Sequence, residues 1–259
     1  VRLFRRLLSG SLDPDKLDYL NRDAYFCGVP YGTQDIDFAI SRLRPNGPDG
    51  IALLSSGISA VENILFSKYL MYRAVYWHRN VRVATAMIKE GLYHGLREGL
   101  IGERDLYGLT DESFYAGFSA RPEPPFDLIR RVYNRQLYRP AFDIAYDDGS
   151  ESHRRLSDLE HRARVEERLR TLIAKAVGRG VDPLQVIVDI PEAISFEVSF
   201  PVIDGDEVLD YPQAGTVFTP HVIEDFTRTL RRIRLILEPG VAAELRSGRD
   251  LLVEAVESA

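Results

Sequence analysis

A short acidic stretch near the start of the sequence carries residue types that could bind a phosphorylated ligand. In SLDPDKLDYLNRD (11–23), Lys16, Tyr19 and Asp23 stand at positions i, i+3 and i+7, on one face of a helix. Asp15 belongs to the first turn of that helix, and a carboxylate there can bind a divalent cation. A lysine and a tyrosine hydroxyl can contact phosphate oxygens, and a second acid can accept a hydrogen bond from a sugar hydroxyl. An acidic first turn also complements the dipole of any helix, and the pattern by itself favours that structural role.

A second stretch, KYLMYRAVYWHR (68–79), places Lys68, Tyr72 and Tyr76 four residues apart, so that they form one stripe of a helix. Two tyrosine rings offer flat surfaces for a base or a sugar, and a lysine offers positive charge for a phosphate. The alternative is an aromatic stripe that packs in a core with its hydroxyls at the rim. Taken alone, this stretch favours the alternative.

The histidines give no pattern of a metal site. None is followed by Asp, and no two stand at a metal-binding helical spacing. Each is therefore interpreted as a packed or surface histidine: His78, His94, His153, His161 and His221.

The elements expected to position these residues are helical in the first half of the chain. The first helix has Asp13 as its N-cap, Pro14 in its first turn and Gly28 after its last turn. One long helix or a kinked pair is expected from Ser59 to about Leu96, where no proline occurs. Further elements are predicted as helices at 33–43, 109–118 (capped by Thr110) and 125–138, and a strand at 50–56.

The periodicity changes near Pro140 from helical to alternating. Strands are predicted at 140–148, 184–190, 195–203 and 233–239, with helices at 151–180 and 221–232. The order β-α-β-β-α-β is that of a ferredoxin-like sandwich. The predicted fold is therefore mainly α with an α+β part: a helical domain at 1–138 and a small α+β domain with a terminal helix at 139–259.

Together, the two chemistry-bearing stretches resemble the HD-domain metal-dependent phosphohydrolases, in particular their deoxynucleoside triphosphate triphosphohydrolase (dGTPase-like) branch. The pattern D-x-D-K-x-D-Y-x-x-R-D-x-x-x-x-G marks the family's helix with the last metal ligand, and M-Y-x-x-V-Y-x-H marks the long helix after it. The resemblance covers about residues 9–91 and weakens beyond them. It implies that this chain corresponds to the C-terminal half of an HD-domain helical bundle with its α+β tail.

The resemblance implies a role for each matching residue. Asp15 matches the catalytic metal-binding aspartate, and Lys16 matches a lysine that contacts substrate phosphate. Tyr19 matches a tyrosine beside the deoxyribose, and Asp23 an acid near the sugar 3′-hydroxyl. Tyr76 matches a tyrosine that lines the sugar pocket and in some members excludes a 2′-hydroxyl.

Two positions depart from the family's pattern. Lys68 stands where some members have a phosphate-binding arginine, and a lysine lacks the bidentate geometry of a guanidinium. Tyr72 stands where some members have an active-site histidine, which would alter substrate choice and proton transfer.

The metal site is the largest departure. The family holds a divalent ion (of the Mg, Mn or Fe class) with a histidine, a His-Asp pair and a later aspartate, and this sequence contains no His-Asp dipeptide. One carboxylate cannot hold a catalytic metal, which needs three or more protein ligands. We therefore expect a fragment of a longer protein, a split enzyme completed by another chain, or a pseudoenzyme.

Composition agrees with this interpretation. The net charge of −6 attracts no nucleic acid, and no apolar run is long enough for a bilayer. A single cysteine, Cys27, excludes a disulfide framework and fits a reducing, cytoplasmic compartment. The expected activity is hydrolysis of a dNTP to nucleoside and tripolyphosphate by the complete protein. The expected partners are a nucleotide substrate and either further copies of the chain or the missing N-terminal HD segment. The rival prediction is an inactive nucleotide-binding or assembly module.

Overall fold

The computed structural model describes residues 12–47, 50–192, 194, 200–245 and 247–258. The chain divides into two compact units, one formed by residues 1–77 and 193–230 and the other by residues 78–192 and 231–259. The predicted boundary at 138/139 lies inside the second unit, where the strand residues Ile187 and Ile236 share a core with the helices that precede residue 139. No helix among the described residues is long and apolar enough to cross a membrane.

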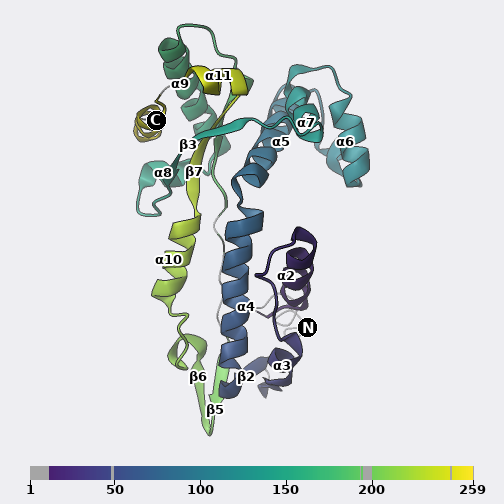
Figure 1. Cartoon of the computed structure of the whole chain (residues 1–259), viewed down its shortest axis with the longest axis vertical. Coiled ribbons are helices and arrows are strands. Elements are labelled where there is room, and N and C mark those ends of the chain that lie inside the picture. Colours follow the sequence, from purple (N-terminus) through teal and green to yellow (C-terminus); the bar gives the residue numbers. More distant parts are fainter. Residues whose placement is uncertain (1–11, 48–49, 193, 195–199, 246, 259) are drawn as a thin grey trace. The chain divides into compact units, whose positions relative to one another are not determined.

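The first unit is built on one helix, α4 (Ile58–Met71), with α2 (Pro14–Cys27) beside it (Figure 1). A four-stranded sheet of order β1-β2-β5-β6 completes the unit, and β2 pairs in parallel with β5 although about 150 residues separate them. Its other described elements are α3 (Ile36–Ser41), β1 (Leu43–Pro45), β2 (Ile51–Leu54), η2 (Ser55–Gly57), β5 (Pro201–Asp204), β6 (Glu207–Asp210), η6 (Tyr211–Gln213) and α10 (Pro220–Leu230).

The ends of α2 are those that the sequence predicts. The Asp13 carboxylate accepts a hydrogen bond from the Lys16 amide at 2.7 Å, and Pro14 occupies the first turn, where no amide donor is needed. Gly28 ends the helix in the left-handed conformation with a φ of 66°. Leu17, Leu20 and Ala24 form the buried face of α2.

The long helical region expected from Ser59 to Leu96 is a pair of helices with a π-helical turn between them. After α4, the turn η3 (Tyr72–Tyr76) forms an i→i+5 hydrogen bond, in which Trp77 N–H donates to Tyr72 C=O at 2.7 Å. His78 then takes an extended conformation and caps α5 (Arg79–Arg97). The region is therefore two helices rather than one long helix.

The second unit has a three-stranded antiparallel sheet of order β3-β7-β4 with helices on both faces. Alternate residues of the strands face opposite sides, so Val186 and Val188 pack with α9 and α12 while Ile187 packs with α5 and α7. Its described elements after α5 are η4 (Glu103–Leu106), α6 (Asp111–Ser119), α7 (Pro124–Tyr133), β3 (Arg139–Ala145), α8 (Glu151–Arg155), α9 (Leu159–Val177), η5 (Pro183–Gln185), β4 (Val186–Asp189), β7 (Arg232–Leu237), α11 (Pro239–Glu244) and α12 (Arg249–Glu257).

Two parts of the topology prediction need correction. The described strands do not form a ferredoxin-like sandwich, because β5 pairs with β2 and β6 rather than with β3, β4 or β7. The helix predicted at 151–180 is divided into α8 and α9, since Asp158 caps a new helix by accepting a hydrogen bond from the His161 amide. Part of the strand predicted at 195–203 lies outside the described residues.

Candidate functional site

The candidate site lies in the first unit, where α2 faces α4 and its π-helical turn. The hydroxyl of Tyr76 donates a 2.7 Å hydrogen bond to Asp23 Oδ2. The ring of Tyr19 meets the ring of Tyr76 edge to face, with 6.2 Å between the centroids. The two helices thus bring together three residues that the sequence singles out.

The stripe on α4 continues this contact. The Tyr72 and Tyr76 rings lie 5.1 Å apart in an edge-to-face arrangement, and Tyr72 also meets Trp77 at 5.5 Å. Lys68 is almost fully buried, and its ammonium group lies 6.0 Å from the centre of the Tyr72 ring, within the range of a cation–π contact. We call Tyr19, Asp23, Lys68, Tyr72 and Tyr76 the tyrosine cluster.

The remaining two predicted residues occupy the start of α2. Lys16 is half-buried, and its ammonium group pairs with Asp13 Oδ2 at 2.7 Å, so Asp13 is an ion-pair partner as well as the predicted helix cap. Asp15 is exposed in the first turn. The negative charges of Asp13 and Asp15 both raise the pKa of the Tyr19 hydroxyl. The first turn of α2 is therefore close enough to the tyrosine cluster to influence its charge state.

The π-helical turn sets the position of Tyr76. A π-helical turn inserts one residue into the helical register, so the side chains after it are rotated relative to those of a regular α-helix. Tyr72 and Tyr76 are the first and last residues of this turn. Turns of this kind are rare and are frequently found at functional sites. No glycine or proline in the stretch indicates the turn in the sequence.

The tyrosine hydroxyls of the cluster keep their protons at neutral pH. Burial, with further contributions from Tyr72 and the nearby acids Asp13, Asp15 and Asp23, raises the pKa of Tyr19 to about 12. Burial and the hydrogen bond to Asp23 raise the pKa of Tyr76 strongly, and burial raises that of Tyr72. These hydroxyls can therefore act as hydrogen-bond donors to a carboxylate or to an acceptor on a ligand.

The described residues do not form a metal centre by themselves. Nowhere in the described part of the chain do three His, Cys, Asp or Glu side chains come close enough together to hold an ion. Asp15, the one residue that the family resemblance assigns to the metal, offers a single exposed carboxylate. The described residues therefore do not fit a complete catalytic metal site.

The family of the chain follows from its sequence. The family described as the HD associated region matches residues 40–219, which is more than half of the chain. The chain belongs to the HD associated region family. The predicted relationship to HD-type proteins is confirmed at this level, and the match includes the stripe on α4.

Curated relatives match about half of this HD associated region chain. An uncharacterized protein of Methanocaldococcus jannaschii, MJ1154, is 32% identical over 146 residues, which are 55% of this chain and 32% of that protein. The uncharacterized protein YwfO of Bacillus subtilis is 31% identical over 156 residues, 51% of this chain and 36% of its own length. A deoxynucleoside triphosphate triphosphohydrolase SAMHD1 homolog of Dictyostelium discoideum is 25% identical over 139 residues, 50% of this chain and 26% of that protein. The chain thus spans about a third of the length of the curated relatives that it matches.

Solved structures share the fold. A phosphohydrolase from Bacteroides thetaiotaomicron superposes with a TM-score of 0.64 at 20% identity, covering 92% of this chain and 64% of that one. A hypothetical protein from Aquifex aeolicus superposes with a TM-score of 0.63 at 23% identity, covering 98% of this chain and 59% of that one. At these identities the likeness concerns the fold.

Proposed function

We propose that this chain supplies the nucleotide-recognition part of an HD-type metal-dependent phosphohydrolase that acts on nucleoside triphosphates, with deoxynucleotides preferred. The complete protein would release a nucleoside and tripolyphosphate. The observation that carries the proposal is the contact of Tyr76 with Asp23 and Tyr19. It joins two motifs that lie 53 residues apart in the chain.

The chemistry of the tyrosine cluster suits a sugar. Asp23 can accept a hydrogen bond from a sugar hydroxyl in place of the one from Tyr76, and the Tyr19 ring offers an apolar face to a deoxyribose. The Tyr76 ring would then fill the space beside the sugar that a 2′-hydroxyl requires. This assigns to Tyr76 the choice between deoxyribose and ribose.

The phosphates would lie toward the first turn of α2. Lys16 follows the exposed Asp15 in the first turn of α2, and a phosphate would compete with Asp13 for its ammonium group. Lys68 is more deeply buried and pairs with an aromatic ring, which makes it a source of positive potential within the cluster rather than a surface anchor. No reaction step is assigned to the metal, because the described residues do not complete its site.

Two comparisons support the hydrolase class: membership of the HD associated region family, and the similarity to a relative whose name is that of a deoxynucleoside triphosphate triphosphohydrolase. The alternative is a nucleotide-binding module without activity, favoured by the single metal-binding carboxylate. Both proposals predict nucleotide binding, and only the hydrolase proposal predicts turnover. In a longer protein that includes upstream metal ligands, Asp15→Ala should abolish hydrolysis of dNTPs if the hydrolase proposal is right.

Binding by the 259-residue chain tests what both proposals share. Isothermal titration with dGTP in EDTA should give saturable binding. Asp23→Asn should weaken it by roughly tenfold, the value of one hydrogen bond to a charged acceptor. Lys16→Ala should weaken the binding of dGTP more than the binding of deoxyguanosine, because we assign this lysine to the phosphates. Lys89→Ala, which removes an exposed lysine of the second unit, is the matched control and should change neither. An absence of dGTP binding to the folded chain would overturn both proposals.

A further inference from the structure

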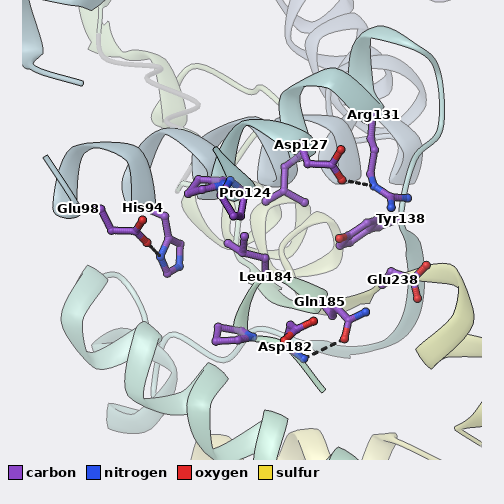
Figure 2. A pocket seen from close by; sticks show the side chains of 13 residues that line it. His94, Glu98, Pro124, Asp127, Arg131, Tyr138, Asp182, Leu184, Gln185 and Glu238 are labelled. Carbon is purple, nitrogen blue, oxygen red and sulfur yellow. Dashed lines mark hydrogen bonds and ion pairs between the residues drawn. The ribbon is translucent and has the colours of Figure 1, made fainter. Parts of the chain in front are cut away.

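A cavity in the second unit has no part in the proposed nucleotide site. Its volume is about 750 Å³, within the range of about 300–1,000 Å³ typical of small-molecule sites. Its walls come from the last turn of α5, from α7, from Tyr138, from the turn η5 and from Glu238 (Figure 2). No residue of the tyrosine cluster lines it.

The lining carries an excess of negative charge. Of its acids, Asp127 is neutralised locally, since its carboxylate accepts hydrogen bonds from Arg130 and Arg131 at 2.7 Å. Glu98 contacts the ring of His94, at 3.5 Å. Among the described residues, Asp182 and Glu238 are in no ion pair, and the Glu238 carboxylate accepts hydrogen bonds from the amides of Gly240 and Val241. No described arginine or lysine forms an ion pair with Glu98, Asp182 or Glu238. Arg131, Arg170 and Arg179 act on Asp182 or Glu238 only at longer range, so the lining keeps an excess of negative charge.

These charges are separated and have apolar surface between them. Figure 2 shows Glu98 beside His94 at one side of the cavity and Glu238 at the other, with Pro124 and Leu184 between them. Such spacing does not suit a metal ion, and no three potential metal ligands converge anywhere in the described part of the chain. It suits a molecule whose own positive charges are separated by an apolar spacer.

Tyr138 adds a polar group to the wall. Its ring lies under the Arg131 guanidinium at 5.8 Å. Burial, with Glu238, Asp127 and Asp182 nearby, raises the pKa of Tyr138 to about 12 although Arg131 acts in the opposite direction. The hydroxyl thus stays neutral, and its oxygen can accept a hydrogen bond from an ammonium group.

We propose that this cavity binds an aliphatic diamine or polyamine. One ammonium group meets Glu98, another meets Glu238 and Asp182, and the methylene chain between them lies on Pro124 and Leu184. The proposal does not rest on the nucleotide function, because it uses residues of the second unit alone.

Isothermal titration of the 259-residue chain with spermidine tests the site. Spermidine should bind saturably, butylamine should bind at least about tenfold more weakly because it carries one charge, and octanediol, which has the spacer without charge, should not bind. Saturable spermidine binding with this order supports the proposal. No spermidine binding, or equal binding of spermidine and butylamine, overturns it.

Charge-removing variants locate the ligand. Glu98→Gln and Glu238→Gln should each weaken spermidine binding by about three- to tenfold, the contribution of one partly enclosed ion pair. Glutamine keeps an acceptor for the amides that Glu238 caps, and a circular dichroism melt of each variant checks that it is folded. Glu103→Gln removes an exposed acid of the same unit outside the cavity and should leave binding unchanged. An equal loss in all three variants would show general surface attraction and overturn the proposal.

A lysine-rich peptide presents the same ammonium chemistry from a protein. Tetralysine should bind more weakly than spermidine, since its peptide backbone is bulkier and more polar than the methylene spacer of a polyamine. Strong tetralysine binding that Glu98→Gln abolishes, without binding of spermidine, would assign the cavity to a protein partner and overturn the polyamine proposal.

Discussion

The Tyr76 hydroxyl and the Asp23 carboxylate are joined by a 2.7 Å hydrogen bond that fastens α2 to the π-helical end of α4. Both side chains are half-buried, so water competes only in part for the two groups. Hydrogen bonds to a charged acceptor are among the stronger ones in proteins. This contact therefore has a structural role as well as the role in sugar recognition that we propose.

Tyr76→Phe isolates the structural role, because it keeps the ring and removes the hydroxyl. We expect the free energy of unfolding in urea to fall by about 1–2 kcal/mol, since Asp23 loses its donor in a half-buried environment. Tyr25→Phe removes a hydroxyl from a side chain that is 81% exposed and should change stability by less than about 0.5 kcal/mol. Equal stabilities of the two variants would contradict the assigned bond strength.

Stability should fall at alkaline pH because of the buried tyrosines. Folding raises the pKa of Tyr19 to about 12, so the folded chain keeps a proton that the unfolded chain loses near pH 10. The stabilising contribution is complete below about pH 10 and is lost as the pH rises toward 12. Urea unfolding across this window should show a smaller decrease for Tyr19→Phe than for the wild type. If the stability of Tyr19→Phe falls as much as that of the wild type, the pKa of Tyr19 is not raised by folding.

A buried ion pair in the second unit offers a test of its core. Asp189 is 4% exposed and pairs with Arg82 and with Arg234, which are also buried. Asp189→Asn should cost about 3 kcal/mol, because two buried guanidinium groups lose their counter-charge. Glu192→Gln breaks an exposed pair with Lys89 and should cost less than about 1 kcal/mol. Urea titrations of both variants measure the difference, and a cost of the same size for each would contradict the assignment.

Close packing of α5 on α7 requires a glycine. A Cβ atom at Gly91 would lie 2.7 Å from the Pro125 carbonyl oxygen, which belongs to the backbone and cannot turn away. Gly91→Ala should therefore destabilise the chain by roughly 1–3 kcal/mol. Gly117 in α6 has no atom within 4 Å of the equivalent position, so Gly117→Ala should be neutral or stabilise by up to about 1 kcal/mol. In thermal melts the midpoint should fall for Gly91→Ala and should stay the same or rise for Gly117→Ala. A fall for Gly117→Ala as large as that for Gly91→Ala would contradict the role assigned to Gly91.

The parts of the fold that the sequence predicts correctly are those set by local chemistry. Asp13, Pro14 and Gly28 define both ends of α2, and Thr110 caps α6, because caps act within a few residues. The spacing of Tyr72 and Tyr76 places them on one helix stripe, and their contact follows.

The parts that sequence reasoning misses depend on distant partners. The strand β5 has four residues, and nothing in them specifies that β2, far back in the chain, is its partner. The π-helical turn arises in a stretch without glycine or proline, so no residue type indicates it. The ion pair of Lys16 with Asp13 is missed because Asp13 is predicted only as the helix cap. The cavity of the second unit combines residues from several separate segments, none of which has a motif.

Discrimination between deoxyribose and ribose tests the central claim most directly. Equilibrium binding of dGTP and GTP should be compared for the wild-type chain, Tyr76→Ala and the exposed control Tyr25→Ala. We predict that the wild type and the control bind dGTP at least roughly tenfold more tightly than GTP, because the Tyr76 ring occupies the space of a 2′-hydroxyl. Tyr76→Ala should bring the ratio close to one. If the ratio is the same in all three proteins, or no nucleotide binds, the tyrosine cluster is not a nucleotide site.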